Sequence, residues 1–210
     1  MLIGADGSGR RLIDEAKPNA GDSSRHPVLP RWSADGTKVL YGERYWEGSG
    51  PLNIYDVATA AKQQVARDGG IILFHWALSG KAFLAGQGSY GDLYSDRAKL
   101  FEPGTDKPIA LTDGPVESRP LAVSPDGHLG LLSLELVQWG RNTPGEPVGW
   151  PSLWTIDLTS RRLALLAMPD QSGPDWLLGG APVAWSDDGT IYFGVVTPGP
   201  KTRLVGLKIK

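Results

Sequence analysis

The stretch RWSADGTKVLYG, residues 31–42, places the polar turn SADG between two apolar runs. Nearly the same pattern returns as WALSGKAFLAG (76–86), AVSPDGHLGLL (122–132) and AWSDDGTIYFG (184–194). In Ser-x-Asp-Gly, side-chain oxygens accept hydrogen bonds from nearby backbone N–H groups, and the glycine adopts the positive φ that a tight turn requires. Each copy therefore predicts two strands joined by a tight turn.

The copies recur with a regular period. Their turn glycines, Gly36, Gly80, Gly127 and Gly189, are spaced 44, 47 and 62 residues apart, and the insertion 139–151 accounts for the longest spacing. A second pattern of apolar run, polar turn and apolar run follows the first three copies, starting at Asn53, Lys99 and Leu153. Four strands in a period of about 40 to 50 residues are typical of a β-propeller blade.

One aligned position in the repeat carries large side chains. Trp32, Trp76, Val123 and Trp185 fall there, at the end of the first strand of each unit. That strand is apolar at nearly every position, which predicts an innermost strand buried on both faces. We expect these four side chains to act as wedges between neighbouring blades.

These residues resemble the TolB-type (WD40-like) propeller repeat, in which an apolar strand is followed by Trp-Ser-Pro-Asp-Gly and, later, by Ile-Tyr-x-x-Asp. WSADG and WSDDG match this pattern closely, VSPDG lacks the Trp, and WALSG lacks the Asp. IYDVAT (54–59) and TIDLTS (155–160) resemble the third strand and its turn. The resemblance covers almost the whole chain and implies an all-β propeller of four-stranded antiparallel blades. It is specific for fold and not for function.

The repeat divides residues 1–210 into one domain of consecutive units. We expect third and fourth strands of a terminal blade in 1–25, full blades in 26–68, 69–114 and 115–168, and a blade without its fourth strand in 175–210. The two partial units are complementary. Either they close a small propeller, or the chain is an open arc of a larger ring whose bare ends require a partner, such as a second copy.

Composition restricts the functional classes. The net charge is −2 with mixed signs, so we expect no nucleic-acid partner, and no apolar run is long enough to span a membrane. The chain has no Cys, no Gly-x-Ser-x-Gly motif and no phosphate-binding glycine loop. Its three histidines lack zinc-motif spacing. We therefore assign no catalytic residue, metal or cofactor, and we favour a non-enzymatic protein.

Two groups of residues are candidates for binding. Arg31 and His75 occupy the same aligned position on the first strands, so we expect them to line the central channel and to hold an anionic group. The competing interpretation pairs Arg31 with a carboxylate and gives His75 a structural hydrogen bond. The second group consists of aromatics in the variable loops between second and third strands, where binding residues often lie: Tyr45, Trp46, Tyr90, Trp139 and Trp150.

The sequence thus predicts a binding or scaffold module that contacts a protein or glycan through its variable-loop face and channel mouth. The alternative is the gating or substrate-binding propeller of a serine peptidase or a sugar-acid lyase system. The resemblance implies a periplasmic or extracytoplasmic location, although the first residues, MLIGADGSGRR, do not have the pattern of a signal peptide.

Overall fold

The computed structural model of the protein describes residues 8–15, 26–45, 48–66, 71–87, 97–105, 107–113, 116–136, 152–167, 176–177, 183–197 and 201–209. They form strands, connecting turns and one short 3-10 turn at Leu78–Gly80. None of these residues belongs to a helix that is long and apolar enough to cross a membrane.

The strands form four antiparallel sheets that follow one another along the chain. The first contains β1 (His26–Trp32), β2 (Lys38–Tyr45), β3 (Gly48–Asp56) and β4 (Lys62–Ala66). The second contains β5 (Ile71–Ala77), β6 (Ala82–Gln87), β7 (Arg97–Phe101) and β8 (Ile109–Ala110). The third contains β9 (Val116–Val123), β10 (Leu129–Leu136), β11 (Ser152–Asp157) and β12 (Leu163–Ala167). The last contains β13 (Trp176–Leu177), β14 (Ala184–Trp185), β15 (Thr190–Thr197) and β16 (Lys201–Lys208).

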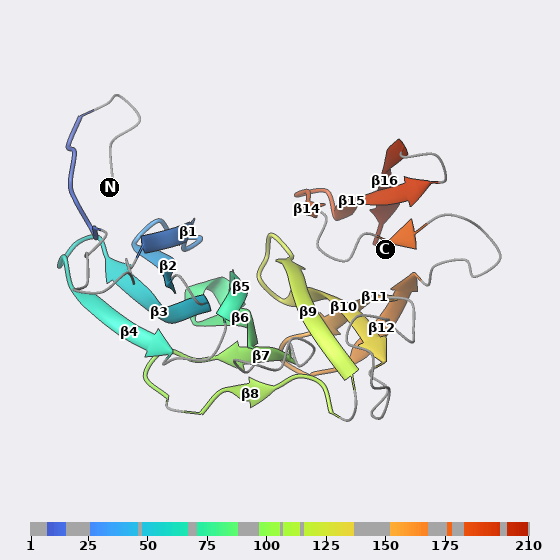
Figure 1. Ribbon diagram of the computed structural model, residues 1–210, viewed down its shortest axis with the longest axis horizontal. Coiled ribbons are helices and arrows are strands. Elements are labelled where there is room, and N and C mark those ends of the chain that lie inside the picture. Colours follow the sequence, from blue (N-terminus) through green and yellow to red (C-terminus); the bar gives the residue numbers. More distant parts are fainter. Residues whose placement is uncertain are drawn as a thin grey trace.

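The sheets are the blades of a propeller-like arc, with the first and last sheets at its two ends (Figure 1). The first strands of the first three sheets and β14 of the last contact one another in turn, β1 with β5, β5 with β9 and β9 with β14, so they form the inner side of the arc. In the last sheet β13 and β14 both pair with one edge of β15, and β16 pairs with the other. The all-β architecture predicted from the repeat is confirmed.

Apolar side chains fill each junction between sheets. Leu40 and Leu52 of the first sheet pack against Phe74 and Phe83 of the second, whose Phe83 and Phe101 rings stack with centroids 5.0 Å apart. Similar clusters join the second sheet to the third and the third to the last. Each sheet therefore buries a face against its neighbour, and burial of apolar area stabilises the arc.

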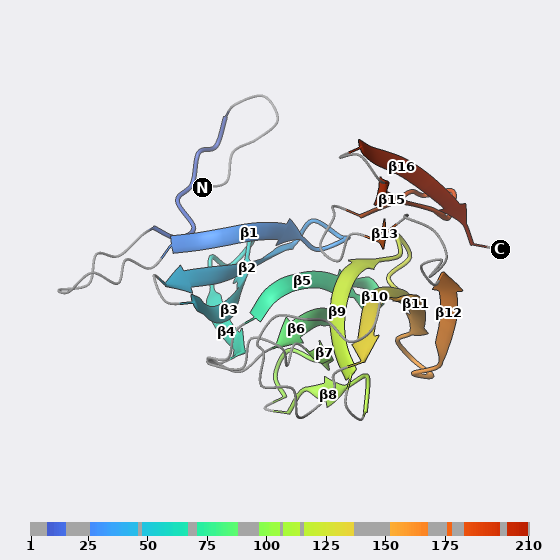
Figure 2. The same ribbon diagram turned by 45° about the vertical axis from the view of Figure 1, so that its right-hand side comes forward.

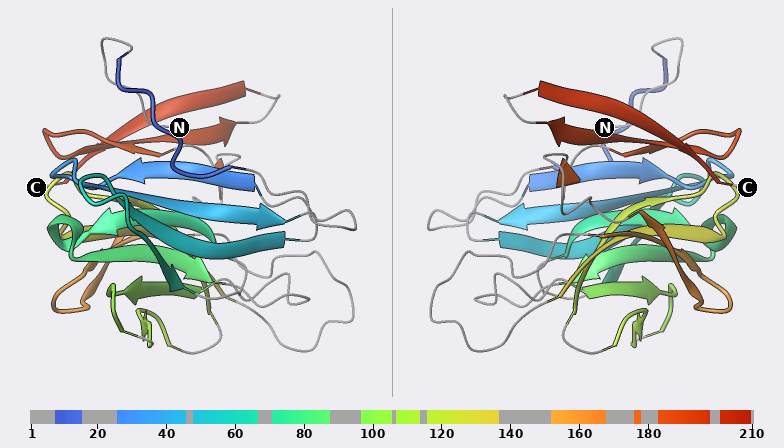
Figure 3. Two further views of the ribbon diagram at one scale, coloured as in Figure 1. Left: turned by 90° about the vertical axis from the view of Figure 1, so that its left-hand side faces the viewer. Right: turned by 90° about the vertical axis from the view of Figure 1, so that its right-hand side faces the viewer.

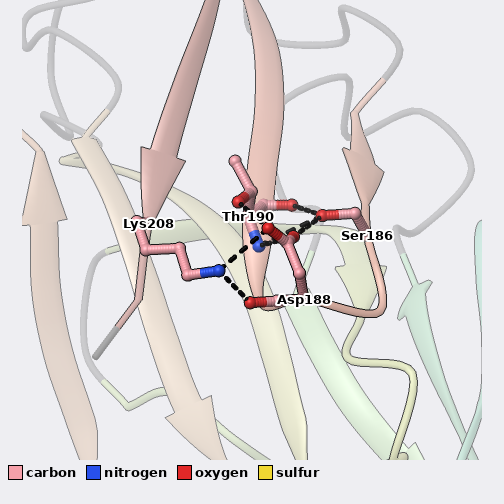
Figure 4. Close-up of polar contacts among 4 residues, drawn as sticks. All are labelled: Ser186, Asp188, Thr190 and Lys208. Carbon is pink, nitrogen blue, oxygen red and sulfur yellow. Dashed lines mark hydrogen bonds and ion pairs between the residues drawn. The ribbon is translucent and has the colours of Figure 1, made fainter.

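The repeated polar turns have the geometry that their sequence predicts. In the first, Ser33 Oγ donates a hydrogen bond to Asp35 Oδ1 over 2.6 Å, and Thr37 N donates to the same oxygen over 3.0 Å. These bonds hold the pKa of Asp35 at about 2. Gly36 has a φ of 69°. Equivalent Ser–Asp bonds occur in the third and last sheets, between Ser124 and Asp126 and between Ser186 and Asp188 (Figure 4).

The last of these turns is one residue tighter than the others. The aligned bulky residue pairs with the third residue after the turn glycine in the first three sheets, as Trp32 does with Val39. In the last sheet, Trp185 pairs with Ile191, the second residue after Gly189. A slip of one residue reverses which side chains face which side of a strand. The slip turns Ile191 and Phe193 toward the third sheet, where both are buried.

Residues 8–15 cover the outer face of the first sheet (Figure 3, left). Ile13 packs against Val39, Tyr41 and Tyr55, which are at most 4% exposed. Arg11 donates a hydrogen bond to the Val57 carbonyl and lies over the Tyr55 ring, 5.3 Å from its centroid. This segment contains an isolated bridge residue and no strand. The predicted completion of the last blade by residues 1–25 stays a prediction.

The segment is also attached through Asp14. Its Oδ2 accepts hydrogen bonds from the Tyr41 hydroxyl over 2.8 Å and from Lys62 Nζ over 2.6 Å. Burial, together with the hydrogen bond to Asp14, raises the pKa of Tyr41 to about 12. The phenol therefore keeps its proton and remains a donor to the Asp14 carboxylate at neutral pH.

The expected wedges are present in part. Trp76 and Trp185 are partly buried against the junction clusters, and Val123 lies at the equivalent place in the third sheet. Trp32 is 54% exposed, and every residue of β1 except Val28 is exposed. The prediction of a wedge at Trp32 was wrong, because β1 lies at one end of the arc and no sheet formed by the described residues packs on that side of it.

Candidate binding site on the inner side of the arc

Prolines mark the inner edge on which the site lies. Pro27 and Pro30 lie in β1, and Pro120 lies in β9. A proline has no N–H to donate, so it is confined to strand edges that pair with no further strand. These residues therefore favour an open inner edge, and side chains of the first strands are available there.

Arg31 is an exposed side chain on this edge. Its backbone pairs with Leu40, and its carbonyl accepts a hydrogen bond of 3.0 Å from the Trp76 indole of the second sheet. A register shift between Val28 and Arg31 interrupts the ladder, and Leu29 within it has a φ of 51°. Bulges with such strained residues re-aim side chains and are common beside functional sites.

His75 occupies the equivalent position on β5, where it pairs with Leu84. Burial of its side chain, together with the nearby charge of Arg31, lowers the pKa of His75 to about 4. The imidazole is therefore neutral at pH 7. The positive charge here at neutral pH therefore belongs to Arg31, on the equivalent strand of the preceding sheet.

The competing interpretation of these two residues requires a carboxylate that pairs with Arg31 and a group that forms a hydrogen bond with His75. Across the described ranges, no carboxylate forms an ion pair with Arg31, and no group forms a hydrogen bond with the His75 ring. A guanidinium exposed in this way retains all its donors for an anion. Leu29 and Trp32 of the same strand are 43% and 54% exposed, but Trp32 pairs with Val39 of the outer face and therefore points to the opposite side of β1 from Arg31.

The side chains of the second predicted group lie outside the described residues. Tyr45 ends β2, and its side chain lies outside the described residues, as do Trp46, Tyr90, Trp139 and Trp150. Tyr45 is five residues beyond Leu40, the partner of Arg31, which corresponds to about 17 Å along an extended strand. The Arg31 site thus lies toward the tight turns, at the opposite end of the strands from the variable loops. The loop aromatics stay a prediction.

Sequence reasoning missed a second polar group on the inner side. Glu117 of β9 is buried, lies opposite Glu135 of β10 in the strand register, and contacts Arg119 over 3.4 Å. Burial raises the pKa of Glu135, and the charge of Arg119 opposes this rise. In the sequence, the charged residues of β9 stand among apolar ones, so the pattern of the strand did not single them out as a polar group. No group of three or more metal-ligating side chains occurs in the described ranges.

Comparisons with known proteins identify the fold. No family model matches the chain, and no curated protein matches its sequence. Among solved structures, TolB from Acinetobacter baumannii superposes with a TM-score of 0.63 at 14% identity, over 99% of this chain and 45% of that chain. A Mycobacterium tuberculosis puromycin-hydrolyzing peptidase gives a TM-score of 0.59 at 13% identity, over 87% of this chain and 27% of that chain.

An oligogalacturonate lyase from Vibrio parahaemolyticus gives a TM-score of 0.54 at 14% identity, over 93% of this chain and 58% of that chain. The chain therefore spans slightly less than half the length of TolB and about a quarter of the length of the peptidase. At these identities the superpositions concern architecture alone. On the repeat, the four sheets and these superpositions, the chain adopts a TolB-like β-propeller fold.

Proposed function

We propose that this protein is a non-enzymatic binding module that holds a carboxylate of a partner protein on Arg31, at the inner edge of the arc. The single observation that carries the proposal is the exposed Arg31 guanidinium, which has no carboxylate partner in the described part of the chain. Arg is suited to this role because its fork of donors matches a carboxylate in a bidentate manner.

The surroundings of Arg31 favour a protein over a free small anion. Trp32 and Leu29 are exposed on the same strand. Arg and Trp are the residue types most enriched among the energetically dominant residues of protein interfaces. Because Trp32 points to the opposite side of β1 from Arg31, a partner that contacts both residues would have to cross the edge of the strand, which a protein segment can do and a small anion cannot.

The test uses fluorescence anisotropy with an array of labelled acidic peptides, each made with a free and an amidated carboxyl terminus. Arg31→Ala should weaken the binding of the peptides that the native protein selects by at least about tenfold, the effect of one charge-assisted bond. Arg31→Lys should restore part of the affinity. Arg162→Ala, which removes another exposed arginine far from the inner edge, is the control.

The pH dependence provides an independent check. Because the pKa of His75 is about 4, affinity should not change between about pH 6 and 8. Equal binding by the native protein and Arg31→Ala would reject the proposal. An affinity that rises as pH falls from 8 to 6 would assign the charge to a histidine instead of Arg31.

A second candidate is the substrate-admitting propeller of a peptidase or lyase system. The observation that favours it is that a puromycin-hydrolyzing peptidase contains the same arrangement of sheets within 27% of its length. A hydrolase domain encoded in the same transcript would support this candidate. In that case Arg31 would meet the carboxylate of a substrate instead of a partner.

A further inference from the structure

Arg31 and Trp76 point into the same junction, the one between the first and second sheets. In the strand registers Arg31 lies opposite Leu40, and Trp76 lies opposite Phe83. Residues that lie opposite each other in neighbouring strands point to the same side of their sheet. Leu40 and Phe83 both belong to the core cluster of this junction, so Arg31 and Trp76 approach it from its two sides. Figure 2 shows β1 (blue) above β5 (green) in this part of the arc.

A hydrogen bond across the junction joins the two residues. Trp76 Nε1 donates to the Arg31 carbonyl over 3.0 Å. His75, the neighbour of Trp76 on β5, lies opposite Leu84, which belongs to the cluster between the second and third sheets. The indole that contacts the Arg31 backbone from the second sheet therefore belongs to Trp76, one residue beyond the position that the repeat alignment indicated.

The hydrogen bond from Trp76 reaches β1 directly after a β-bulge. Between Val28 and Arg31 the register of β1 against β2 shifts by one residue. Leu29, inside this bulge, has a φ of 51°. The left-handed conformation is costly for a leucine, and it is more so before Pro30, because a proline restricts the preceding residue to extended conformations. A residue strained in this way persists only where its surroundings hold it.

The strain at Leu29 is unusual because it lies within a strand. In the described ranges, the other non-glycine residues of positive φ lie in connections between strands: Ala60, Leu78, Ser79 and Arg161. The cost of one left-handed leucine is of the same order as the net contribution of one hydrogen bond. Loss of the bond from Trp76 is therefore enough to shift the balance between the bulged and the regular strand.

We propose that Trp76 is a positioning residue for Arg31: its hydrogen bond holds the bulge of β1, and the bulge directs the guanidinium toward the group that it binds. Bulges re-aim the side chains that follow them. Without the bulge, a slip of one residue would turn Arg31 to the opposite side of β1, away from the second sheet. The inference rests on the proposed function, because it concerns how that same binding site is held in place.

Fluorescence anisotropy with the acidic peptides that the native protein selects tests the inference. Trp76→Phe keeps an aromatic ring but removes the donor, and it should weaken binding about three- to tenfold. Adding Leu29→Gly to this variant removes the left-handed strain and should restore the affinity to within about twofold of the native value, which a general packing role of Trp76 would not allow. The matched control is Trp154→Phe, which removes an indole donor to Ser152 Oγ within the third sheet and should leave binding unchanged.

Nuclear Overhauser contacts between β1 and β2 provide a second measurement, which needs no ligand. The native protein and the double variant should show contacts for both the Val28–Gly42 pair and the Arg31–Leu40 pair. Trp76→Phe alone should lose one of the two sets. Retention of both sets in Trp76→Phe would overturn the inference. So would unchanged peptide binding by Trp76→Phe where Arg31→Ala weakens it, and the proposed function would then stand alone. Equal binding by the native protein and Arg31→Ala would instead reject the proposed function and this inference together.

Discussion

At the first end of the arc, Val39, Tyr41 and Tyr55 are buried beneath residues 8–15, whereas at the last end Tyr192 and Leu204 are exposed. The first sheet retains the common register of the inner hairpin, and its bulky outer residues are covered by another segment of the chain. The last sheet has a slipped register, which places Tyr192, Gly194, Leu204 and Gly206 on the corresponding strands of its outer face.

This difference shows how an end of a repeat array reaches stability. A repeat at the end of an array has no neighbouring repeat on one of its faces. That face therefore needs either a covering segment or fewer bulky apolar side chains. At the first end, the cap is held by an ion pair and a hydrogen bond at Asp14. At the last end, the tighter turn buries Ile191 and Phe193 against the third sheet.

The largest effect is expected from removing a tyrosine at each end. Tyr41→Ala should lower the free energy of unfolding by about 3–5 kcal/mol, because it deletes a side chain that is 1% exposed. Tyr192→Ala, at 39% exposure, should lower it by less than about 1 kcal/mol. Urea unfolding followed by tryptophan fluorescence measures both. Equal losses would show that the two outer faces are equally covered in solution.

A smaller effect separates the interior of the arc from its ends. Gly127 has a φ of 79°, and an added Cβ would lie 2.9 Å from Ser79 N of the second sheet, whereas Gly36 faces open space. Gly127→Ala should destabilise the protein by about 2–4 kcal/mol, from left-handed strain plus overpacking. Gly36→Ala should destabilise it by about 1–2 kcal/mol, from strain alone. Thermal unfolding of both variants tests the difference, and a reversed order would contradict the turn packing.

Attachment of the cap should depend on Asp14. Asp14→Asn removes the charge that Lys62 contacts and should weaken attachment by about 1 kcal/mol. Trypsin should then cleave after Arg10 and Arg11 several times faster than in the native chain. Glu15→Gln, at an exposed neighbouring carboxylate, is the matched control and should not change the cleavage rate.

The same attachment should respond to acid. Although burial alone would raise the pKa of Asp14, hydrogen bonds from Lys62 and Tyr41 and the charge of Lys62 lower it below its usual value. A carboxylate with a depressed pKa stabilises the folded state above its unfolded pKa, and this contribution is lost as pH falls through the folded value. Acid-stable proteases should therefore find the cap closed at pH 5 and increasingly open as the pH falls below about 4, through the lowered pKa of Asp14. Opening between pH 7 and 5 would assign attachment to another group.

The smallest effect is expected at the last end. Lys208→Ala removes an ion pair in which both side chains are more than half exposed. Solvent and salt screen such pairs strongly, so the urea midpoint should stay within experimental error. A measurable loss that disappears at high salt would show that this end is more enclosed than its exposure indicates.

Much of the architecture is readable from local patterns. Ser-x-Asp-Gly requires only residues close in sequence to form its hydrogen bonds, and the structure contains them at Asp35, Asp126 and Asp188. The shared position of Arg31 and His75 was likewise visible in the alignment of the repeats, and the structure places them on the first strands of adjacent sheets.

Other features depend on residues that are distant in sequence. Trp32 belongs to the repeat pattern, yet it is exposed, because no other sheet within the described ranges packs against it. Asp14 lies 27 residues from Tyr41 and 48 from Lys62, so no local pattern indicates their contact. The one-residue slip between Trp185 and its partner strand occurs at a turn that has the same Ser-x-Asp-Gly sequence as the turn of the first sheet. The sequence pattern therefore gives no sign of the slip.

Hydrogen bonds within a few residues and the alternation of apolar side chains were enough to specify the turns, the strands and the repetition of four-stranded sheets. The cap on the first end, the register of the last hairpin and the accessibility of Arg31 depended on which surfaces meet in the assembled arc. The physical reason is that a turn is stabilised by its own few residues, whereas burial depends on neighbours supplied by distant parts of the chain.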